Sequence, residues 1–194
     1  MANNVIETVA AGKPAGIRTI VAALNWFKEA VKKISSINVL RLFEDSKKSM
    51  KTNINIESIG CMYMFYYDPK HKKTLPYYDV FPLIFVVDIY PDGFLGLNLH
   101  YLPPYLRAKL MTALYSIALK EGDMVKLQLT YQLLKGASRF RWFKPCLKRY
   151  LFSHVRSKFL FVEPEKWDLV LMLPTQKFVK QSEETVWKHS RDMV

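Results

Sequence analysis

The feature that most constrains the fold is a pair of apolar runs, "LIFVVDIY" and "GFLGLNLHYL", joined by the turn residues "PDG". Runs rich in β-branched and aromatic residues on either side of a tight Gly-containing turn predict an antiparallel hairpin. We therefore expect strands over 83–90 and 94–101, with Gly93 supplying a positive φ at the turn. In the second run every second residue is a leucine, which indicates a strand with one row facing a core.

Three further segments predict strands of the same sheet, at 61–67, 158–163 and 167–173, because they are short and rich in aromatic and apolar residues. A helix is expected over 105–120, where prolines fit the first turn and a glycine follows the end. Helices followed by strands, helices and strands again indicate an α+β fold. The expected architecture is a small antiparallel sheet or SH3-like barrel with flanking helices.

The chain divides, on this interpretation, into an N-terminal helical arm, 1–58, and a mixed α+β domain, 59–194, with a basic segment at 124–162. Apolar residues recur at helical spacing over 17–34, and a second short helix is expected at 39–50. Other expected elements are a helix or extended segment at 124–135 and a C-terminal helix capped by Ser182.

Charge is concentrated in one part of the chain. The formal net charge is +12, and residues 124–162 contain nine Lys and Arg and no Asp or Glu. A solvated protein surface usually mixes both signs, so this segregation favours a polyanionic partner: nucleic acid, an anionic membrane or an acidic protein face. The alternative is a solvated basic face without a partner.

The stretch "FKPCLKRYLFSHVRS" predicts a helix over about 145–156, with Leu147, Leu151 and Val155 on the core side at spacings of four. Its other side is then a phosphate-binding surface, because arginine and lysine pair with phosphate and an aromatic ring can stack on an unpaired base. The predicted DNA-binding residues are Arg139, Arg141, Trp142, Lys144, Lys148, Arg149, Arg156 and Lys158.

Other chemistries have little support. The cysteines and histidines show none of the short spacings of zinc sites, and no nucleotide-binding or nucleophile motif is present, so no metal, cofactor or catalytic residue is predicted. A metal-dependent nuclease built on Asp68, Asp79, Asp88, Asp92, Glu163 and Glu165 is a less favoured alternative, because several of these carboxylates lie in turn sequences.

Two further sequence features indicate the cellular compartment: the placement of the cysteines and the length of the apolar runs. Cys61 and Cys146 are far apart in apolar surroundings, as expected of reduced, buried thiols in a cytosolic protein. The longest apolar run, "VFPLIFVV", is interrupted by proline and too short to span a membrane. A soluble protein without a membrane partner is expected.

Two blocks, at 62–111 and 143–174, resemble the DNA end protector proteins of T-even-like tailed bacteriophages. The resemblance lies in "YYDVFPL", "GFLGLNLHYLPP" and "FKPCLKRYLFSHVRS". It implies a late-acting virion protein that binds the ends of packaged linear double-stranded DNA near the portal. It also implies protection of those ends from host exonuclease after injection, head completion, and head–tail joining with portal or neck proteins.

That resemblance places the protein in the virion head near the portal or neck, and in the host cytoplasm during assembly and after injection. The implied activity is binding, so no catalytic residue is implied. A neck, tail or baseplate subunit that uses its basic surface for protein contacts remains the alternative, and the sequence leaves the oligomeric state open.

Overall fold

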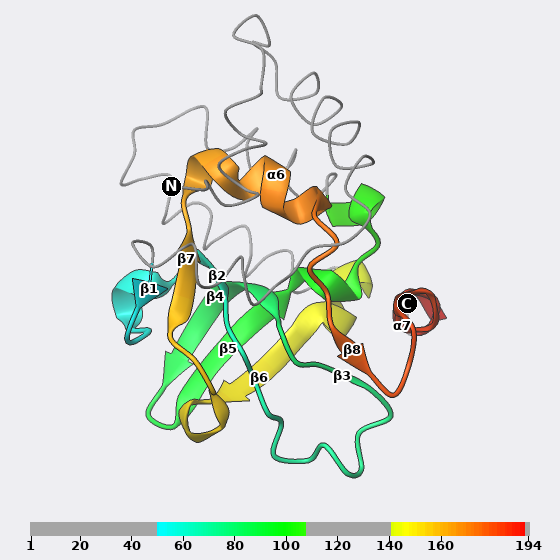
Figure 1. Cartoon of the computed structure of the whole chain (residues 1–194), viewed down its shortest axis with the longest axis horizontal. Helices are drawn as coiled ribbons and strands as arrows, with labels where there is room; N and C mark the ends of the chain where they lie inside the picture. The colour runs from blue at the N-terminus through cyan, green and yellow to red at the C-terminus, as the bar shows by residue number, and fades with distance from the viewer. Residues whose placement is uncertain (1–49, 108–140, 193–194) are drawn as a thin grey trace, which may run out of the picture.

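The structure is a computed structural model that describes residues 50–107 and 141–192. Its centre is a six-stranded antiparallel sheet in the order β1-β7-β2-β4-β5-β6 (Figure 1). The strands are β1 Met50–Lys51, β2 Met62–Met64, β4 Leu83–Tyr90, β5 Gly93–Asn98, β6 Leu147–Leu151 and β7 Phe159–Val162. A separate pair joins β3 Tyr78–Asp79 to β8 Phe178–Val179.

Short helical elements surround this sheet. Two α-helices lie entirely within the described residues, α6 Trp167–Met172 and α7 Glu183–Asp192, and a third begins at residue 104. The 3-10 turns are η2 Ile56–Ser58, η3 Leu99–Tyr101, η4 Arg141–Cys146, η5 Phe152–His154 and η6 Pro164–Lys166. The predicted α+β class with a small antiparallel sheet is confirmed. Within the described residues the sheet is open, with β1 and β6 at its edges, and no barrel closes.

The predicted hairpin is confirmed: β4 pairs with β5 from Tyr90 opposite Gly93 onward. The reason given for Gly93 is wrong, because the one described glycine with a positive φ is Gly60. Gly93 is required by close packing instead: a Cβ there would lie 1.9 Å from the carbonyl oxygen of Tyr150 on β6. The second strand ends at Asn98, where a 3-10 turn replaces the expected continuation.

The predicted helix over 145–156 is wrong. Residues Leu147–Leu151 form β6, which pairs with β5, and the 3-10 turns η4 and η5 flank it. Apolar residues four apart fit a strand face as well as a helix face, since four is also an even number of strand positions. The strand forms because its backbone N–H and C=O groups pair with those of β5, which satisfies the hydrogen-bonding groups of both segments.

The predicted strand over 167–173 is also wrong, since this segment is α6. Three consecutive residues, Leu169, Val170 and Leu171, are fully buried, so the apolar residues of this helix show no helical periodicity. Trp167 anchors its start: the indole N–H donates to the carbonyl of Val162 at 2.9 Å, and the ring packs edge-on against Phe85.

Both faces of the sheet are buried. One face carries Leu83, Phe85 and Leu97 and packs against α6 and α7 residues. The other carries an aromatic cluster in which the ring of Phe65 lies within 5.6 Å, centroid to centroid, of Phe94 and Tyr150. Gly96 of β5 faces this second core, where a Cβ would meet the side chains of Ile84 and Tyr150.

Arg107 is fully buried where the helix after β5 begins. Its guanidinium donates to the carbonyls of Leu102 at 2.7 Å and Leu171 at 3.2 Å, so it joins this helix start to the end of α6. Burial lowers the pKa of Arg107 to about 10. The helix starts at residue 104, in agreement with the role expected of the two prolines.

Several expectations lie outside the described residues: the helices at 17–34 and 39–50, the segment at 124–135, the helix beyond residue 107, and most of the arm 1–58. The C-terminal helix is confirmed, with the Ser182 hydroxyl accepting from the N–H of Thr185 at 3.4 Å. Cys146 is buried, Cys61 is half-buried, and both are free thiols. No helix in the described part of the chain is long and apolar enough to cross a membrane.

Candidate nucleic-acid interface

The predicted DNA-binding residues do not share one helix face. Arg139 lies outside the described residues, and Arg141 and Trp142 are described only by the backbone of η4. Lys144, Arg156 and Lys158 are exposed. Lys148 and Arg149 are consecutive residues of a strand, so their side chains leave opposite faces of the sheet.

Lys148 extends over the ring of Tyr101, with its ammonium 4.1 Å from the ring centroid. This is a cation–π contact, in which the ring face attracts the charge. The side chain is partly enclosed, and burial lowers the pKa of Lys148. Lys148 is therefore not the freely exposed lysine that a helical surface would provide.

Arg149 is engaged at the tip of the hairpin. Its guanidinium pairs with the carboxylate of Asp92, donates to the carbonyl of Tyr150 at 3.2 Å and lies 4.2 Å from the ring centroid of Tyr90. These contacts neutralise much of its charge within the protein. Arg149 is thus a weaker candidate for phosphate binding than Lys148.

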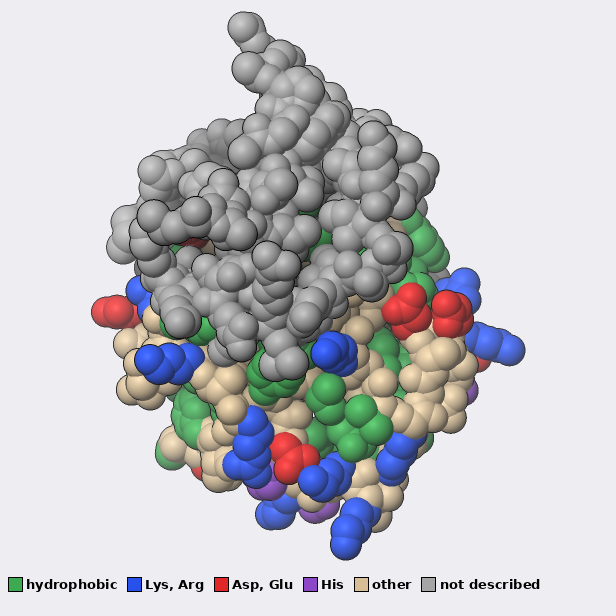
Figure 2. Space-filling view, in the orientation of Figure 1, with side chains coloured by type: hydrophobic (Ala, Val, Ile, Leu, Met, Phe, Trp, Pro, Cys, Tyr) green, Lys and Arg blue, Asp and Glu red, His purple; other side chains and the backbone are tan. Residues whose placement is uncertain are grey.

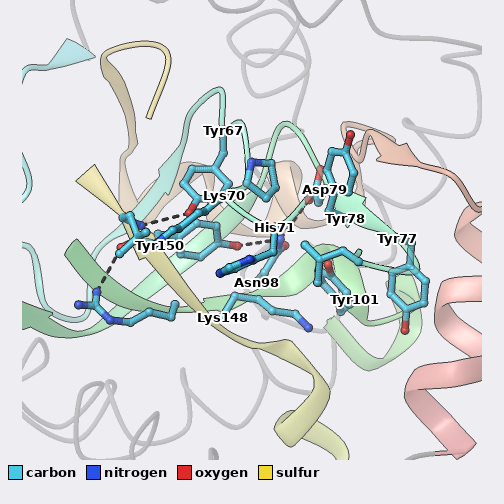
Figure 3. Close-up of a pocket in the computed structure, with 14 residues that line it drawn as sticks. Tyr67, Lys70, His71, Tyr77, Tyr78, Asp79, Asn98, Tyr101, Lys148 and Tyr150 are labelled. Atoms are coloured by element: carbon cyan, nitrogen blue, oxygen red, sulfur yellow. Dashed lines mark hydrogen bonds between the residues drawn. The ribbon is translucent and has the colours of Figure 1, made fainter. Parts of the chain in front are cut away.

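A pocket of about 400 Å³ lies beside β6, where three distant segments of the chain meet. The first is the stretch from Tyr67 to Asp79, the second is Asn98 with Tyr101, and the third is β6 from Lys148 onward. Figure 3 shows Lys148 extending toward Tyr101, with Tyr67 and Tyr150 toward the other end of the pocket. The structure thus adds a concave site that the sequence interpretation missed.

Tyrosines dominate the pocket lining, and two of them offer hydroxyl groups of defined orientation. The hydroxyl of Tyr67 accepts the N–H of Leu151 at 3.2 Å, and that of Tyr150 accepts from the side-chain amide of Asn98 at 3.1 Å. Burial raises the pKa of both Tyr67 and Tyr150, so both hydroxyls keep their protons at neutral pH. Each therefore keeps a proton that it can donate in a hydrogen bond.

A buried hydrogen-bond network supports the pocket from behind. One oxygen of Asp79 accepts from the N–H groups of Phe81 at 3.0 Å and Lys177 at 3.3 Å. The other accepts from the amide of Asn98 at 3.1 Å and from Nδ1 of His100 at 2.7 Å. The network joins β3, the end of β5 and the segment before β8, and so holds the pocket segments in place.

His100 continues this network to Thr175, whose Oγ1 lies 3.0 Å from Nε2. Burial lowers the pKa of His100, so the imidazole is neutral at pH 7: Nδ1–H donates to Asp79, and Nε2 accepts from the Thr175 hydroxyl. The order Asp–His–Thr resembles a nucleophilic triad. However, His100 and Thr175 are fully buried, so the hydroxyl has no access to a substrate and the arrangement is structural.

A second basic element, not predicted from the sequence, adjoins the pocket. Lys70 and His71 line it, and Lys72 and Lys73 follow in the same loop, all four exposed. The "DPKHKK" pattern indicated only a turn, and its nearness to β6 depends on pairing between residues far apart in the chain. Figure 2 shows Lys and Arg side chains gathered around hydrophobic side chains in the lower part of the molecule.

The carboxylates considered for a nuclease do not converge. Asp68 pairs with Lys72 at 2.8 Å and lies 3.7 Å from Arg156, and Asp88 accepts from the N–H of Ile89. Asp79 is enclosed in its network, Asp92 pairs at the hairpin tip, and Glu163 pairs with Lys166 at 2.8 Å. In the segments that the structure describes, no group of three or more His, Cys, Asp or Glu residues is placed to hold a metal ion.

Comparison with known families adds the decisive observation. A family model described as the phage T4 terminal DNA protecting protein matches residues 3–190. The chain belongs to this family. The match confirms the resemblance to DNA end protectors and extends it through the N-terminal arm, where the sequence motifs indicated nothing. No curated protein and no solved structure matches the chain.

Membership of the terminal DNA protecting family makes DNA the expected partner of the basic surface. The pocket combines an ammonium group, phenolic donors and aromatic rings, which are the groups that hold phosphates and unstacked bases. The family is described by protection of DNA and not by a reaction. This description is consistent with a binding protein.

Proposed function

We propose that this protein binds the ends of the packaged linear double-stranded phage DNA and shields them from host exonuclease. The observation that carries the proposal is the family match over residues 3–190. Protection by binding needs an end-blocking surface and no catalytic group. The basic residues and the pocket beside β6 supply chemistry suited to that task.

The basic side chains divide into two proposed roles. Exposed residues at the surface contact backbone phosphates of the duplex, which supplies affinity without sequence preference. These are Lys70, Lys144 and Lys158, together with Lys72 and Arg156, which share the exposed carboxylate of Asp68 and would exchange it for phosphate. Lys148, held within the pocket, contacts the DNA end itself.

The site of action follows from this role. A protein bound to the end of packaged DNA acts in the virion head near the portal or neck, and in the host cytoplasm during assembly and after injection. We propose portal or neck proteins as partners in head completion and head–tail joining. The net charge of +12 suits DNA more than a basic surface made only for protein contacts.

An exonuclease protection assay tests the proposal. The protein is bound to linear duplex DNA, a processive exonuclease is added, and the surviving full-length DNA is measured over time. We expect protection at one or two proteins per end, well below coating of the duplex. As a control, an endonuclease should cut internal sites at the normal rate.

Equal slowing of both nucleases would mean general coating of DNA and would refute end protection. Absence of protection together with retained folding would assign the basic surface to protein contacts, as in a neck, tail or baseplate subunit.

A further inference from the structure

The pocket beside β6 offers hydrogen-bond donors but little acceptor capacity. Its donors include the ammonium of Lys148 and the hydroxyls of Tyr67 and Tyr150. Asp79 is the one acidic residue among the described lining residues, and each of its oxygens already accepts two hydrogen bonds from the protein. Such a site complements an anion that accepts several hydrogen bonds.

Lys148 itself lacks a counter-charge in the described part of the chain. Its ammonium lies against the ring of Tyr101, and no carboxylate of the described residues pairs with it. Partial burial of an ammonium without an anion is unfavourable, because water is removed without a compensating charge. The lowered pKa of Lys148 has the same cause. An anion bound in the pocket would remove this deficit.

The pocket also has aromatic surface suited to a base. Tyr77 and Tyr78 are half-buried at the pocket, and Leu75 adds apolar surface beside them. The ring of Tyr77 is stacked on His189, with 5.8 Å between the ring centroids, so only its other face is left for a base. Bases stack on such rings without sequence preference, because every base has a π-face. Phosphate-binding donors next to aromatic surface match the two halves of a nucleotide.

Size limits the ligand. A volume of about 400 Å³ lies at the lower end of the range for small-molecule pockets, roughly 300–1,000 Å³. A paired base inside a duplex reaches such a pocket only by unpairing and unstacking, whereas a single-stranded or frayed nucleotide reaches it at the lowest cost. A nucleotide-sized ligand of this pocket would therefore come from a strand end more readily than from internal duplex.

We propose that this pocket binds the 5′-phosphorylated terminal nucleotide of a DNA strand. Its phosphate lies at Lys148, Tyr67 and Tyr150, and its base lies against Tyr77 and Tyr78. A terminal phosphate monoester carries about −1.5 to −2 charges at pH 7, more than a backbone diester, so it suits an ammonium that no described carboxylate neutralises better. This inference rests on the proposed function, since it names the part of the DNA end that is recognised.

Short oligonucleotides test the pocket separately from end protection. Calorimetry would compare the 5′-phosphorylated dinucleotide pTpT with unphosphorylated TpT and with inorganic phosphate. We expect pTpT to bind at least tenfold more tightly than either, because only pTpT fills both halves of the site. Lys148→Met and Tyr150→Phe should each lower the affinity for pTpT at least threefold.

Lys51→Met is the matched control. Lys51 also lies over an aromatic ring, with its ammonium 6.0 Å from the centroid of Phe161, but on β1 at the opposite edge of the sheet. Its replacement should leave pTpT binding unchanged. Thermal unfolding shows whether each variant is folded. If Lys148→Met does not fold, Tyr150→Phe still tests the pocket.

The outcomes separate the two proposals. Equal affinity for pTpT and TpT would overturn the pocket assignment even if the protein protects linear DNA. Inorganic phosphate binding as tightly as pTpT would overturn the nucleotide assignment and leave an anion site. Tight pTpT binding that depends on Lys148, without protection of linear DNA, would support the nucleotide pocket and refute the proposed function.

Discussion

Replacement of Asp79 by Asn tests whether the buried network holds the pocket together. The carboxylate accepts four hydrogen bonds, two at each oxygen, from Phe81, Lys177, Asn98 and His100. An asparagine keeps the shape but replaces one carboxylate oxygen with an NH2 group. The two donors that bonded to that oxygen in the parent would then face the NH2, which is itself a donor. His100 can relieve one clash by moving its proton to Nε2, whereas the other donors cannot change role.

The expected loss follows from these contacts. Hydrogen bonds to a charged group contribute about 1.5–3 kcal/mol each, and a buried donor left unpaired costs about 1–3 kcal/mol. With one contact recovered through His100, we expect Asp79→Asn to lower the free energy of unfolding by about 2–5 kcal/mol. Because Asp79 also lines the pocket, binding of pTpT should weaken in the folded fraction.

Urea unfolding followed by circular dichroism measures this change. Asp88→Asn is the control, because the Asp88 side chain accepts from the N–H of its neighbour Ile89 at 2.9 Å, and its replacement should cost less than about 1 kcal/mol. Equal losses for the two variants, or a loss below about 1 kcal/mol for Asp79→Asn, would show that the network is not what organises the pocket.

Three further predictions follow from individual residues. Burial lowers the pKa of His100 below 6.5, so the unfolded chain binds this proton before the folded chain does as pH falls. The contribution of His100 to stability should therefore be complete above about pH 6.5 and decline below it. Urea unfolding at pH 7.5 and 5.5 measures this, and an unchanged midpoint would contradict it. Gly93→Ala should lower the free energy of unfolding by more than about 1–3 kcal/mol, because the added Cβ would meet the backbone of Tyr150. In Gly96→Ala the added Cβ would meet the end of the Ile84 side chain at 2.9 Å, so the loss of unfolding free energy in the same assay should be smaller. Arg149→Gln removes an exposed ion pair and should change the melting temperature by only a few degrees, about 1 kcal/mol or less; a larger loss would make that pair structural.

The hairpin was predictable because its signals are local. Two apolar runs and the turn residues between them specify β4 and β5, and the bounds differ from expectation mainly where η3 begins at Leu99. Even here the reason for Gly93 was wrong. The close approach of Tyr150 comes from a strand more than fifty residues away, and the local sequence carries no sign of it.

The errors have a common physical cause. In Leu147–Leu151 the spacing of apolar residues suits a helix or a strand, and pairing with β5 decides. In Trp167–Met172 nearly every residue is apolar, so periodicity is absent and a short buried helix cannot be told from a buried strand. Both choices depend on tertiary contacts.

The site was predictable in its chemistry but not in its geometry. Absence of acidic residues across 124–162 indicated a polyanion partner, and Lys148 was among the residues selected. The sequence placed Lys148 and Arg149 on one exposed helix face. In the structure they are consecutive residues of β6 that both line the pocket, and their side chains are engaged by Tyr101 and by Asp92. The contributions of Tyr67, Lys70 and Tyr101 depend on long-range pairing and had no local signal.

The most direct test of the central claim is competition between linear duplex DNA and a covalently closed circle of the same sequence, measured over a range of salt concentrations. Phosphate contacts make log K fall with log salt, with a slope of about 0.9 per phosphate, for both molecules. End recognition adds a preference for the linear form that persists as salt rises and weakens in Lys148→Met. Equal affinity for linear and circular DNA at every salt concentration would contradict end binding and leave a general DNA-binding protein.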